Sequence, residues 1–248
     1  MRYFLFFSYN GKSYHGWQKQ KKSITVQEKI EESLSVLLKE IIEVVGAGRT
    51  DAGVHAKQMV AHFDVDEIID NPKKLVFKLN QFLSNDISIK SIKSVKNNAH
   101  ARFDAISRTY KYHINKEKDV FLDQYGYYIN YSLNKKKIIE AIKIIVSNND
   151  FKCFVKSKTD VTNYICDVLD AKWLESDQEY IFEITANRFL RNMVRSIVGT
   201  LIDIGSGKTS LNDFVEIIKS KDRSMAGYSV PARGLFLTKI DYPKKIFI

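Results

Sequence analysis

Residues 42–65 read IEVVGAGRTDAGVHAKQMVAHFDV. Apolar and β-branched residues gather at the two ends of this stretch, so residues 42–47 and 58–65 are each expected to form a β-strand. Between them, Gly48 and Gly53 enclose a polar loop, and glycine permits backbone angles and close approaches that other residues resist. The stretch therefore predicts two strands joined by a loop that carries charged side chains.

The segments on either side of this stretch each add a strand and a helix. Upstream, residues 2–9 are rich in aromatic and aliphatic residues and predict a strand. Thr25 then has the spacing of a helix cap ahead of apolar residues at helical intervals. Downstream, Asn71 and Pro72 mark the start of another helix, and residues 87–95 predict a further strand. The order of elements is β-α-β-β-α-β.

The second part of the chain repeats this order without repeating its sequence. The expected elements are a strand at 105–114, a helix capped by Asn134, strands near 164–174 and 179–187, a helix over 189–202, a helix starting at Ser210, and a strand at 234–242. This order predicts an α+β protein of two ferredoxin-like (RRM-like) βαββαβ halves, residues 1–104 and 105–248, sharing one mixed sheet. A substrate is expected in a cleft between the halves.

Composition favours a folded protein with a polyanionic partner. Hydrophobic residues make up 44% of the 248 residues and only three residues are proline, which disfavours a disordered chain. A net charge of +10 suits nucleic acid, although lysine-rich chains from AT-rich genomes also carry such a charge. Cys153 and Cys166 fit neither a disulfide framework nor a zinc motif. No stretch reaches the ~18 apolar residues of a membrane helix, so the cytoplasm is the expected location.

The loop between the two glycines places a cation close to a carboxylate. A guanidinium such as that of Arg49 keeps a nearby carboxylate such as that of Asp51 ionised and oriented, as a nucleophile requires. Spacing alone favours the simpler interpretation, a turn that joins two strands. His55 and His62 could suggest a metal site with Asp51, but the spacing is not a known ligand pattern, so no metal is expected.

A basic strand with interleaved aromatic residues follows. Arg102-Phe103 precedes Arg108, Tyr110 and Tyr112, and alternation places the last three on one face of the strand. An aromatic ring beside an arginine suits an unstacked base and its phosphate. Packing within the sheet is the competing interpretation, and it is the expected one for Tyr112.

Three arginines near the end of the chain have helical spacing. Arg188, Arg191 and Arg195 fall at i, i+3 and i+7 beside an apolar stripe. They predict a basic ridge that faces either RNA or solvent. Arg195 is expected to be partly buried near an acidic partner.

Together these segments resemble the TruA family of tRNA pseudouridine synthases over nearly the whole chain. The matching residues are Tyr9-Asn10-Gly11, Tyr14, Gly16-Trp17-Gln18, Val26-Gln27, Ala47 through Ala56, Gln58, His62-Phe63, His100 through Phe103, Arg108, Tyr110, Tyr112, Asp150-Phe151, Phe189 through Arg195, Ile197 through Gly199, Pro231, Gly234-Leu235 and Asp241-Tyr242. The resemblance implies an isomerase that converts uridine to pseudouridine at positions 38–40 of the tRNA anticodon stem-loop.

The resemblance also implies roles for particular residues. Asp51 would be the nucleophile that attacks the sugar or the base of a flipped-out uridine. Tyr110 would pack on that base, Arg195 would pair with Asp51, and Arg49 would help to occupy the place that the nucleotide leaves. No cofactor is implied.

Further implications concern RNA contacts and assembly. Arg102, Arg108 and Arg191 are further candidates for RNA contacts, and the family resemblance implies a homodimer in the cytoplasm. The segment Thr162-Asn163-Tyr164-Ile165 lacks an arginine that is frequent in relatives, which leaves RNA contacts there open.

Two other functions remain as alternatives. An RRM-like RNA-binding module would explain the charge and the aromatic residues, but not the Arg49–Asp51 pair between glycines. A glycosidase-like enzyme would need a second acid, which the sequence does not locate. The preferred tRNAs, the preferred uridine, the order of sugar and base attack, and the source organism stay open at this point.

Overall fold

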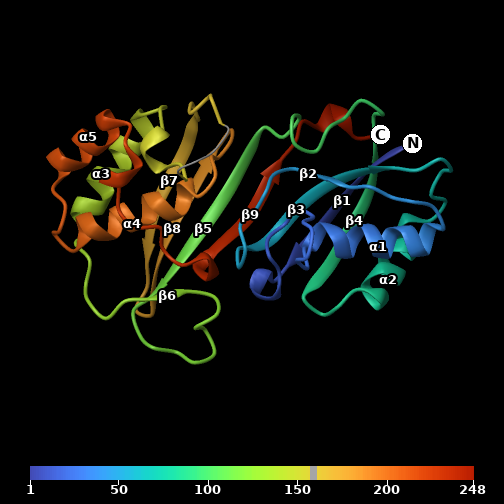
Figure 1. Cartoon of the computed structure of the whole chain (residues 1–248), viewed down its shortest axis with the longest axis horizontal. Coiled ribbons are helices and arrows are strands. Elements are labelled where there is room, and N and C mark those ends of the chain that lie inside the picture. The colour runs from blue at the N-terminus through green and yellow to red at the C-terminus, as the bar shows by residue number, and fades with distance from the viewer. Residues whose placement is uncertain (157–160) are drawn as a thin grey trace. The chain divides into compact units, whose positions relative to one another are not determined.

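The computed structural model describes residues 1–156 and 161–248 (Figure 1). Contacts within the chain divide it into two compact units. Unit 1 consists of Met1–Ile106 together with Leu237–Ile248, and unit 2 consists of Ser107–Phe236. Each unit holds strands and helices of its own.

Unit 1 has the predicted β-α-β-β-α-β order. Its elements are β1 (Arg2–Tyr9), α1 (Val26–Leu38), β2 (Val45–Gly46), β3 (His55–Asp64), α2 (Pro72–Phe82) and β4 (Ile87–Val95). The strands run antiparallel in the order β4-β1-β3, and β2 pairs with β3. Helices α1 and α2 contact each other and lie against this sheet (Figure 1). This is the strand order of a ferredoxin-like half, and it confirms the prediction for this part of the chain.

The strand predicted at residues 42–47 is much shorter than expected. Val45–Gly46 form the paired strand, and the Ala47 N–H adds one further bond to β3, to the Val60 carbonyl at 2.8 Å. Helix α1 binds the backbone of Val44 instead, because the Val44 N–H donates to Glu31 Oε1 at 3.2 Å and the carbonyl accepts from Gln27 Nε2 at 3.1 Å. Side chains of the helix thus replace the ladder bonds that the sequence pattern predicted.

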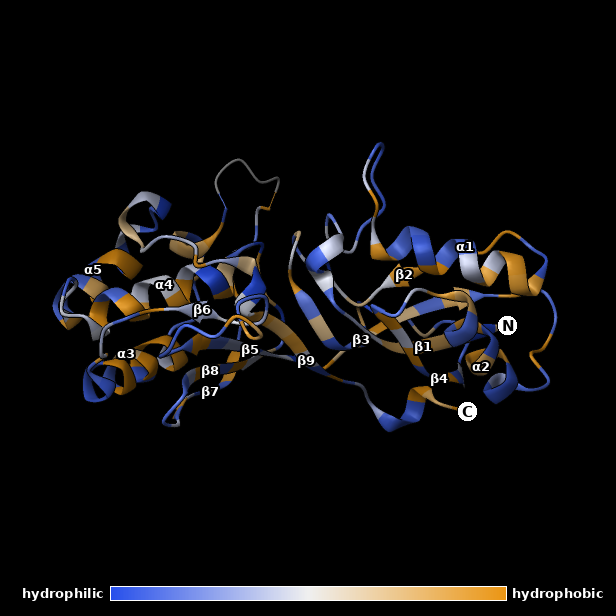
Figure 2. Ribbon diagram, turned by 90° about the horizontal axis from the view of Figure 1, so that it is seen from below, coloured by the Kyte–Doolittle hydropathy of each residue, from blue (hydrophilic) through white to orange (hydrophobic). Residues whose placement is uncertain are grey.

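The caps predicted from the sequence do set the helix starts in unit 1. Thr25 Oγ1 accepts from the Glu28 N–H at 3.5 Å ahead of α1, and Asn71 Oδ1 accepts from the Lys74 N–H at 2.9 Å ahead of α2. Each cap satisfies an amide that a helix start leaves without an intrahelical partner. Hydrophilic and hydrophobic residues lie on different sides of α1, and its apolar side is buried (Figure 2).

The C-terminal segment packs with unit 1. Tyr242 and Phe247 make edge contacts with the ring of Phe4, at centroid distances of 5.1 and 6.1 Å. They cover one face of β1 and so join the core of that unit. The compact units therefore differ at the C-terminus from the halves expected at residues 1–104 and 105–248, which remain a prediction about topology.

Unit 2 also combines a sheet with helices. Its elements are β5 (Ser107–Asn115), β6 (Tyr127–Tyr128), α3 (Lys135–Ser147), β7 (Val168–Glu175), β8 (Glu179–Ala186), α4 (Met193–Gly205) and α5 (Leu211–Ser220), and β9 (Leu235–Asp241) runs from unit 2 into unit 1. Strands β5, β8 and β7 are antiparallel neighbours in that order, while β6 is parallel to β5. Asn134 and Ser210 cap α3 and α5 as predicted. The α+β class with mixed strand pairing is confirmed, and the cleft between the halves stays a prediction.

The helix predicted over residues 189–202 begins later than expected. Helix α4 starts directly after Asn192, whose φ of 68° is left-handed and cannot belong to the helix. Arg188 and Arg191 therefore precede the helix, whereas Arg195 lies within it. The prediction of one basic ridge at helical spacing is wrong, since the three arginines do not share a helix.

Candidate functional site

The loop between β2 and β3 presents the predicted carboxylate at the surface of unit 1. Asp51 is half-buried and Arg49 is exposed. The Asp51 carbonyl accepts from the Val54 N–H at 3.2 Å, which closes a turn, and Gly53 has the left-handed φ of 78°. At Gly48, by contrast, an added Cβ would meet open space. The left-handed backbone thus explains the second glycine of the motif, whereas packing does not explain the first.

Thr50 is the residue through which this loop is held. Its hydroxyl pairs with the Tyr9 hydroxyl at 2.8 Å, and its carbonyl accepts from the Trp17 N–H at 3.2 Å. Both the side chain and the backbone of the residue next to Asp51 are therefore fixed. Such support by neighbouring hydrogen bonds keeps a reactive group in one geometry.

Two glycines of the segment after β1 touch the same loop. A Cβ on Gly11 would lie 2.0 Å from the Val54 carbonyl oxygen, and a Cβ on Gly16 would lie 2.4 Å from the Thr50 carbonyl oxygen. The Gly11 N–H also donates to His55 Nδ1 at 3.1 Å. The backbone of this segment packs so closely on the loop that only glycine fits at both positions.

Strand β5 holds Tyr110 and Tyr112 in different environments. Tyr110 is half-buried and contacts the edge of Phe189 at a centroid distance of 5.0 Å and an interplanar angle of 85°. Tyr112 is fully buried, and its hydroxyl donates to the Pro231 carbonyl at 2.8 Å. Burial raises the pKa of Tyr112 well above its ordinary range. The prediction that Tyr112 packs within the sheet is confirmed.

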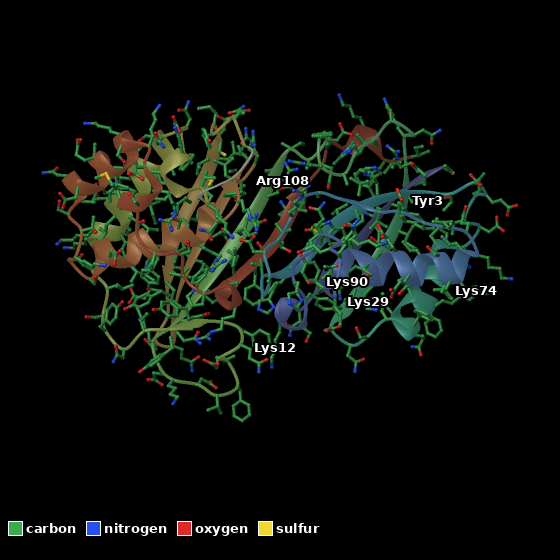
Figure 3. All side chains as sticks on the ribbon, in the orientation of Figure 1. Tyr3, Lys12, Lys29, Lys74, Lys90 and Arg108 are labelled. Atoms are coloured by element: carbon green, nitrogen blue, oxygen red, sulfur yellow. The ribbon has the colours of Figure 1, made fainter. Side chains whose placement is uncertain are left out.

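Arg108 and Arg102 have different kinds of support. Arg108, marked on β5 in Figure 3, donates from Nη1 to the Asn187 carbonyl at 2.7 Å. Arg102 is exposed, and its guanidinium lies 5.7 Å from the ring centroid of Phe103. One cation is tied to the backbone of unit 2, whereas the other lies beside an aromatic ring of unit 1.

Arg195 is tied at both its side chain and its backbone to a segment that follows α5. Its Nε donates to the Val230 carbonyl at 2.7 Å, and the Val230 N–H donates to the Arg195 carbonyl at 3.3 Å. One residue along, Ser229 Oγ accepts from Asn192 Nδ2 at 2.5 Å and from Arg223 Nη2 at 2.9 Å. We call residues 223–234 the strap. The strap fixes the direction in which the half-buried Arg195 guanidinium leaves the helix.

The strap crosses α4 at a point where both backbones lack side chains. A Cβ on Gly199 would lie 1.8 Å from the Tyr228 carbonyl oxygen, and a Cβ on Gly227 would lie 2.6 Å from the Thr200 backbone nitrogen. The Gly227 N–H donates to Thr200 Oγ1 at 2.9 Å. The contact between helix and strap is therefore as close as the contact between Gly11 and the Asp51 loop.

Comparison with known proteins identifies the family. The model of a family described as tRNA pseudouridine synthase matches residues 5–104 and 141–243.

The chain belongs to the tRNA pseudouridine synthase family.

Three relatives named tRNA pseudouridine synthase A match this family member over nearly their full length. The protein of Bacteroides fragilis is 47% identical over 247 residues, which cover 99% of this chain and 98% of the relative. That of Azobacteroides pseudotrichonymphae is 49% identical over 246 residues, covering 99% and 98%. That of Bacillus subtilis is 38% identical over 239 residues, covering 95% and 96%. The protein is thus an enzyme, an isomerase with tRNA as its substrate.

The expected site residues of this tRNA pseudouridine synthase are divided between the units. Unit 1 holds Asp51, Arg49 and Arg102, and unit 2 holds Tyr110, Arg108, Arg191 and Arg195. The two parts of the family match include the Asp51 loop and Arg195, whereas Tyr110 and Arg108 lie between those parts. The pairing of Asp51 with Arg195 and the packing of Tyr110 on a base stay predictions.

The histidines considered as metal ligands have structural partners in this family member. His55 Nδ1 accepts from the Gly11 N–H, and His62 Nδ1 accepts from the Ala101 N–H, each at 3.1 Å. Within residues 1–156 and 161–248, no group of three or more His, Cys, Asp or Glu side chains is placed to hold a metal ion. Both imidazoles serve the hydrogen-bonding role that the sequence favoured.

The two thiols are buried. Burial raises the pKa of Cys153 to about 12 and that of Cys166 to about 11. Thiols protonated at neutral pH are poor nucleophiles.

None of the helices in the described part of the chain has the length and apolar character needed to cross a bilayer.

Sequence reasoning missed the residues that support the site. Tyr9, Gly11, Gly16 and Trp17 mark the family resemblance, but no role followed from their spacing. Glycines interleaved with aromatic residues were the available signal, because glycine permits close backbone approach. The strap gave no signal of helical or strand periodicity.

Proposed function

We propose that the protein converts a uridine at positions 38–40 of the tRNA anticodon stem-loop to pseudouridine, with Asp51 as the nucleophile. The observation that carries this proposal is the support of the Asp51 loop. Thr50 is fixed by Tyr9 and Trp17, and Gly11 packs against the turn that Asp51 begins. A reactive carboxylate benefits from such preorganisation because less ordering remains to be done when the substrate binds.

The reaction needs no oxidant, reductant or cofactor. The carboxylate of Asp51 forms a bond to the anomeric carbon or to the base, and the N1–C1′ bond of the uridine breaks. The base turns, a C1′–C5 bond forms, and the carboxylate is released. The hydrogen on C5 leaves as a proton while N1 takes one up, so the product is an isomer of the substrate. The oxocarbenium character that develops at C1′ is stabilised by a nearby carboxylate.

Three residues assist in this proposal. Arg195 pairs with Asp51 and holds it in place, Tyr110 packs on the flipped base, and Arg49 helps to fill the place that the flipped nucleotide leaves. The fixed direction of the Arg195 guanidinium supports its role. The half-buried ring of Tyr110, which meets the Phe189 ring at an interplanar angle of 85°, suits stacking on a base. Flipping the uridine out of its stack costs a few kcal/mol.

The wider RNA contacts and the assembly are part of the same proposal. Arg102, Arg108 and Arg191 contact the tRNA backbone, and the net charge of +10 supports steep salt dependence of binding. Lys12, Lys29, Lys74 and Lys90 are among the basic side chains of unit 1 (Figure 3). The enzyme acts in the cytoplasm as a homodimer, with one tRNA contacting both subunits, as the family resemblance implies.

The test uses tRNA transcripts labelled with tritium at C5 of uridine, because that hydrogen is released on isomerisation. We expect release by the wild type and none by Asp51→Asn, with tRNA affinity retained. Asp66→Asn is the matched control, since Asp66 is an exposed carboxylate of the same unit, and it should release tritium at the wild-type rate. Loss of both release and binding in Asp51→Asn would assign a structural role to the loop. Tight binding without release by the wild type would favour the RNA-binding module.

A further inference from the structure

The loop between β4 and β5 exposes a large aromatic side chain. Phe103 is 74% exposed. A single exposed apolar residue is ordinary on a protein surface and means little alone. The surroundings of this ring make it unusual, because hydrogen bonds hold the backbone on both sides of it.

Two imidazoles bind the backbone of this loop. His62 Nδ1 accepts from the Ala101 N–H at 3.1 Å, and His100 Nδ1 accepts from the N–H groups of Arg102 and Phe103 at 3.1 and 3.3 Å. Burial is the main cause that lowers the pKa of His62, to about 4, and it also lowers that of His100. Both imidazoles are thus neutral at neutral pH, with the Nδ1 lone pair available to accept.

Further bonds close the loop on both sides of Phe103. The Tyr242 hydroxyl donates to the Ala101 carbonyl at 2.5 Å. Asp104 Oδ2 accepts from the His100 N–H at 2.7 Å, and the Asp104 N–H donates to the His100 carbonyl at 3.0 Å. The exposed ring of Phe103 is therefore carried by a backbone whose motion these hydrogen bonds restrict.

The rings form a series that runs from the core to the surface. The centroids of His62 and His100 are 4.6 Å apart, and those of His100 and Phe103 are 4.3 Å apart with an interplanar angle of 37°. The guanidinium of Arg102 lies 5.7 Å from the Phe103 centroid. An aromatic ring packed on one side, exposed on another and flanked by a cation is the arrangement on which unstacked bases bind.

We propose that Phe103, flanked by Arg102 and backed by His100, is a stacking platform for an unpaired base of the tRNA. Arg102 contacts the phosphate of the same nucleotide. The identity of the ligand as tRNA rests on the function proposed above, whereas the platform itself rests on the geometry of this loop. His100 is a positioning residue, because it acts through the backbone of Arg102 and Phe103.

The stacked base belongs to a different nucleotide from the one that reacts. His55 follows the Asp51 loop and His62 binds the Phe103 loop, and both lie on β3. Seven steps along the strand, from His55 to His62, place them roughly 23 Å apart. A single nucleotide cannot reach both places, so the platform provides a second point of recognition along the RNA.

The test measures tRNA affinity at one salt concentration for wild type, Phe103→Ala and Phe103→Trp. Base stacking on an aromatic side chain corresponds to about a 5- to 150-fold change in affinity. We expect Phe103→Ala to bind tRNA weaker within that range and Phe103→Trp to bind like the wild type. Phe77→Ala is the matched control, since Phe77 is 66% exposed on α2, and it should leave affinity unchanged. Blunt duplex RNA, which offers no unpaired base, should bind all four proteins alike.

Several results would overturn the platform. Equal tRNA affinity for Phe103→Ala and Phe77→Ala would exclude it, as would an equal loss of affinity for duplex RNA. Unchanged tRNA affinity with an altered oligomeric state, measured by light scattering, would assign Phe103 to a protein contact instead. Tritium release separates this proposal from the function proposed above, because Phe103→Ala should raise KM and keep kcat, whereas Asp51→Asn should abolish kcat.

Discussion

Strand β3 carries a histidine near each end, and the loops beside these two histidines are held in different ways. The Asp51 loop lies beside His55, and the Phe103 loop lies beside His62. His55 and His62 each accept a backbone N–H at Nδ1, from Gly11 and from Ala101, at the same distance of 3.1 Å. At the start of the strand, close backbone packing supplements this bond, since a Cβ on Gly11 would lie 2.0 Å from a carbonyl oxygen. At the end of the strand, the neighbouring loop depends on hydrogen bonds to side chains.

The difference matches what each end has to present. A nucleophile has to be placed to within a fraction of an ångström, and packing of backbone against backbone limits its motion most strictly. A stacking ring forms no covalent bond to the base and accepts any base, since every base has a π-face. We therefore expect changes at the start of β3 to alter the rate of reaction and changes at its end to alter RNA affinity or pH dependence.

The largest effect is expected from Gly11→Ala. The added Cβ would force the Val54 carbonyl, and with it the Asp51 turn, to move. A displacement of about 1 Å at a reactive group lowers the rate about 100-fold, so we expect a loss of that order in kcat for tritium release. Denaturant unfolding should show a loss of roughly 1–3 kcal/mol, the usual cost of overpacking.

Gly48→Ala is the control for this prediction. A Cβ at Gly48 would meet open space, so the free energy of unfolding should stay within about 0.5 kcal/mol of the wild type. If Gly11→Ala retained the wild-type kcat, the close packing would not be what positions Asp51, and the comparison between the two ends of β3 would fail.

His62→Asn should change the pH dependence of stability. Burial first, and the charge of Arg2 second, lower the pKa of His62 to about 4, below the ordinary value of 6.5. As the pH falls from 6.5 towards 4, the unfolded chain binds a proton that the folded chain refuses, so stability falls. At about 1.4 kcal/mol for each pH unit, this one group removes roughly 2 kcal/mol between pH 7.5 and pH 5.

The measurement compares urea unfolding of wild type and variant at both pH values. The asparagine introduced in place of His62 would keep an acceptor near the position of Nδ1 but would not titrate, so the variant should lose roughly 2 kcal/mol less between the two pH values. His15→Asn alters an exposed histidine and should keep the wild-type slope. Equal slopes for wild type and His62→Asn would mean that His62 is protonated in the folded chain without cost.

The sequence predicted best what depends on neighbours in the chain. Asn71 and Asn134 were predicted as caps from the local sequence, and both accept a backbone N–H of the first helical turn. Spacing alone favoured a simple turn for the Asp51 loop, and its role as the site was predicted from the family resemblance. Predictions failed where distant contacts decide the outcome. The strand predicted at residues 42–47 is confined to its second half, because side chains of α1 bind the backbone of Val44. No local pattern predicts that contact.

The supports of the site were also out of reach of local patterns. Glycine is a poor helix former, yet Gly199 lies in the middle of α4. The Tyr228 carbonyl explains this glycine, because a Cβ at position 199 would lie 1.8 Å from its oxygen. Periodicity reports which side of a helix is buried, but not which backbone crosses it. Asn192, likewise, made the helix begin later than predicted, because its left-handed φ is stabilised within the fold, where its side chain donates to Ser229.

The smallest effects are expected from a pair of tyrosines that bind the two loops. Tyr9→Phe removes the hydroxyl that pairs with Thr50 at 2.8 Å, and Tyr242→Phe removes the one that donates to the Ala101 carbonyl at 2.5 Å. Each change should lower the free energy of unfolding by about 1 kcal/mol, the usual net value of one hydrogen bond.

The two variants should nevertheless differ in function. Tyr9→Phe should lower kcat several-fold at unchanged tRNA affinity, because it loosens the residue before Asp51. Tyr242→Phe should weaken tRNA binding several-fold at unchanged kcat, because it loosens the loop of Phe103. Titration of tRNA binding and single-turnover tritium release measure the two quantities separately. If both variants changed kcat alone, the loop at the end of β3 would support the reaction and not RNA binding. The proposal that the two ends of this strand support different functions would then be wrong.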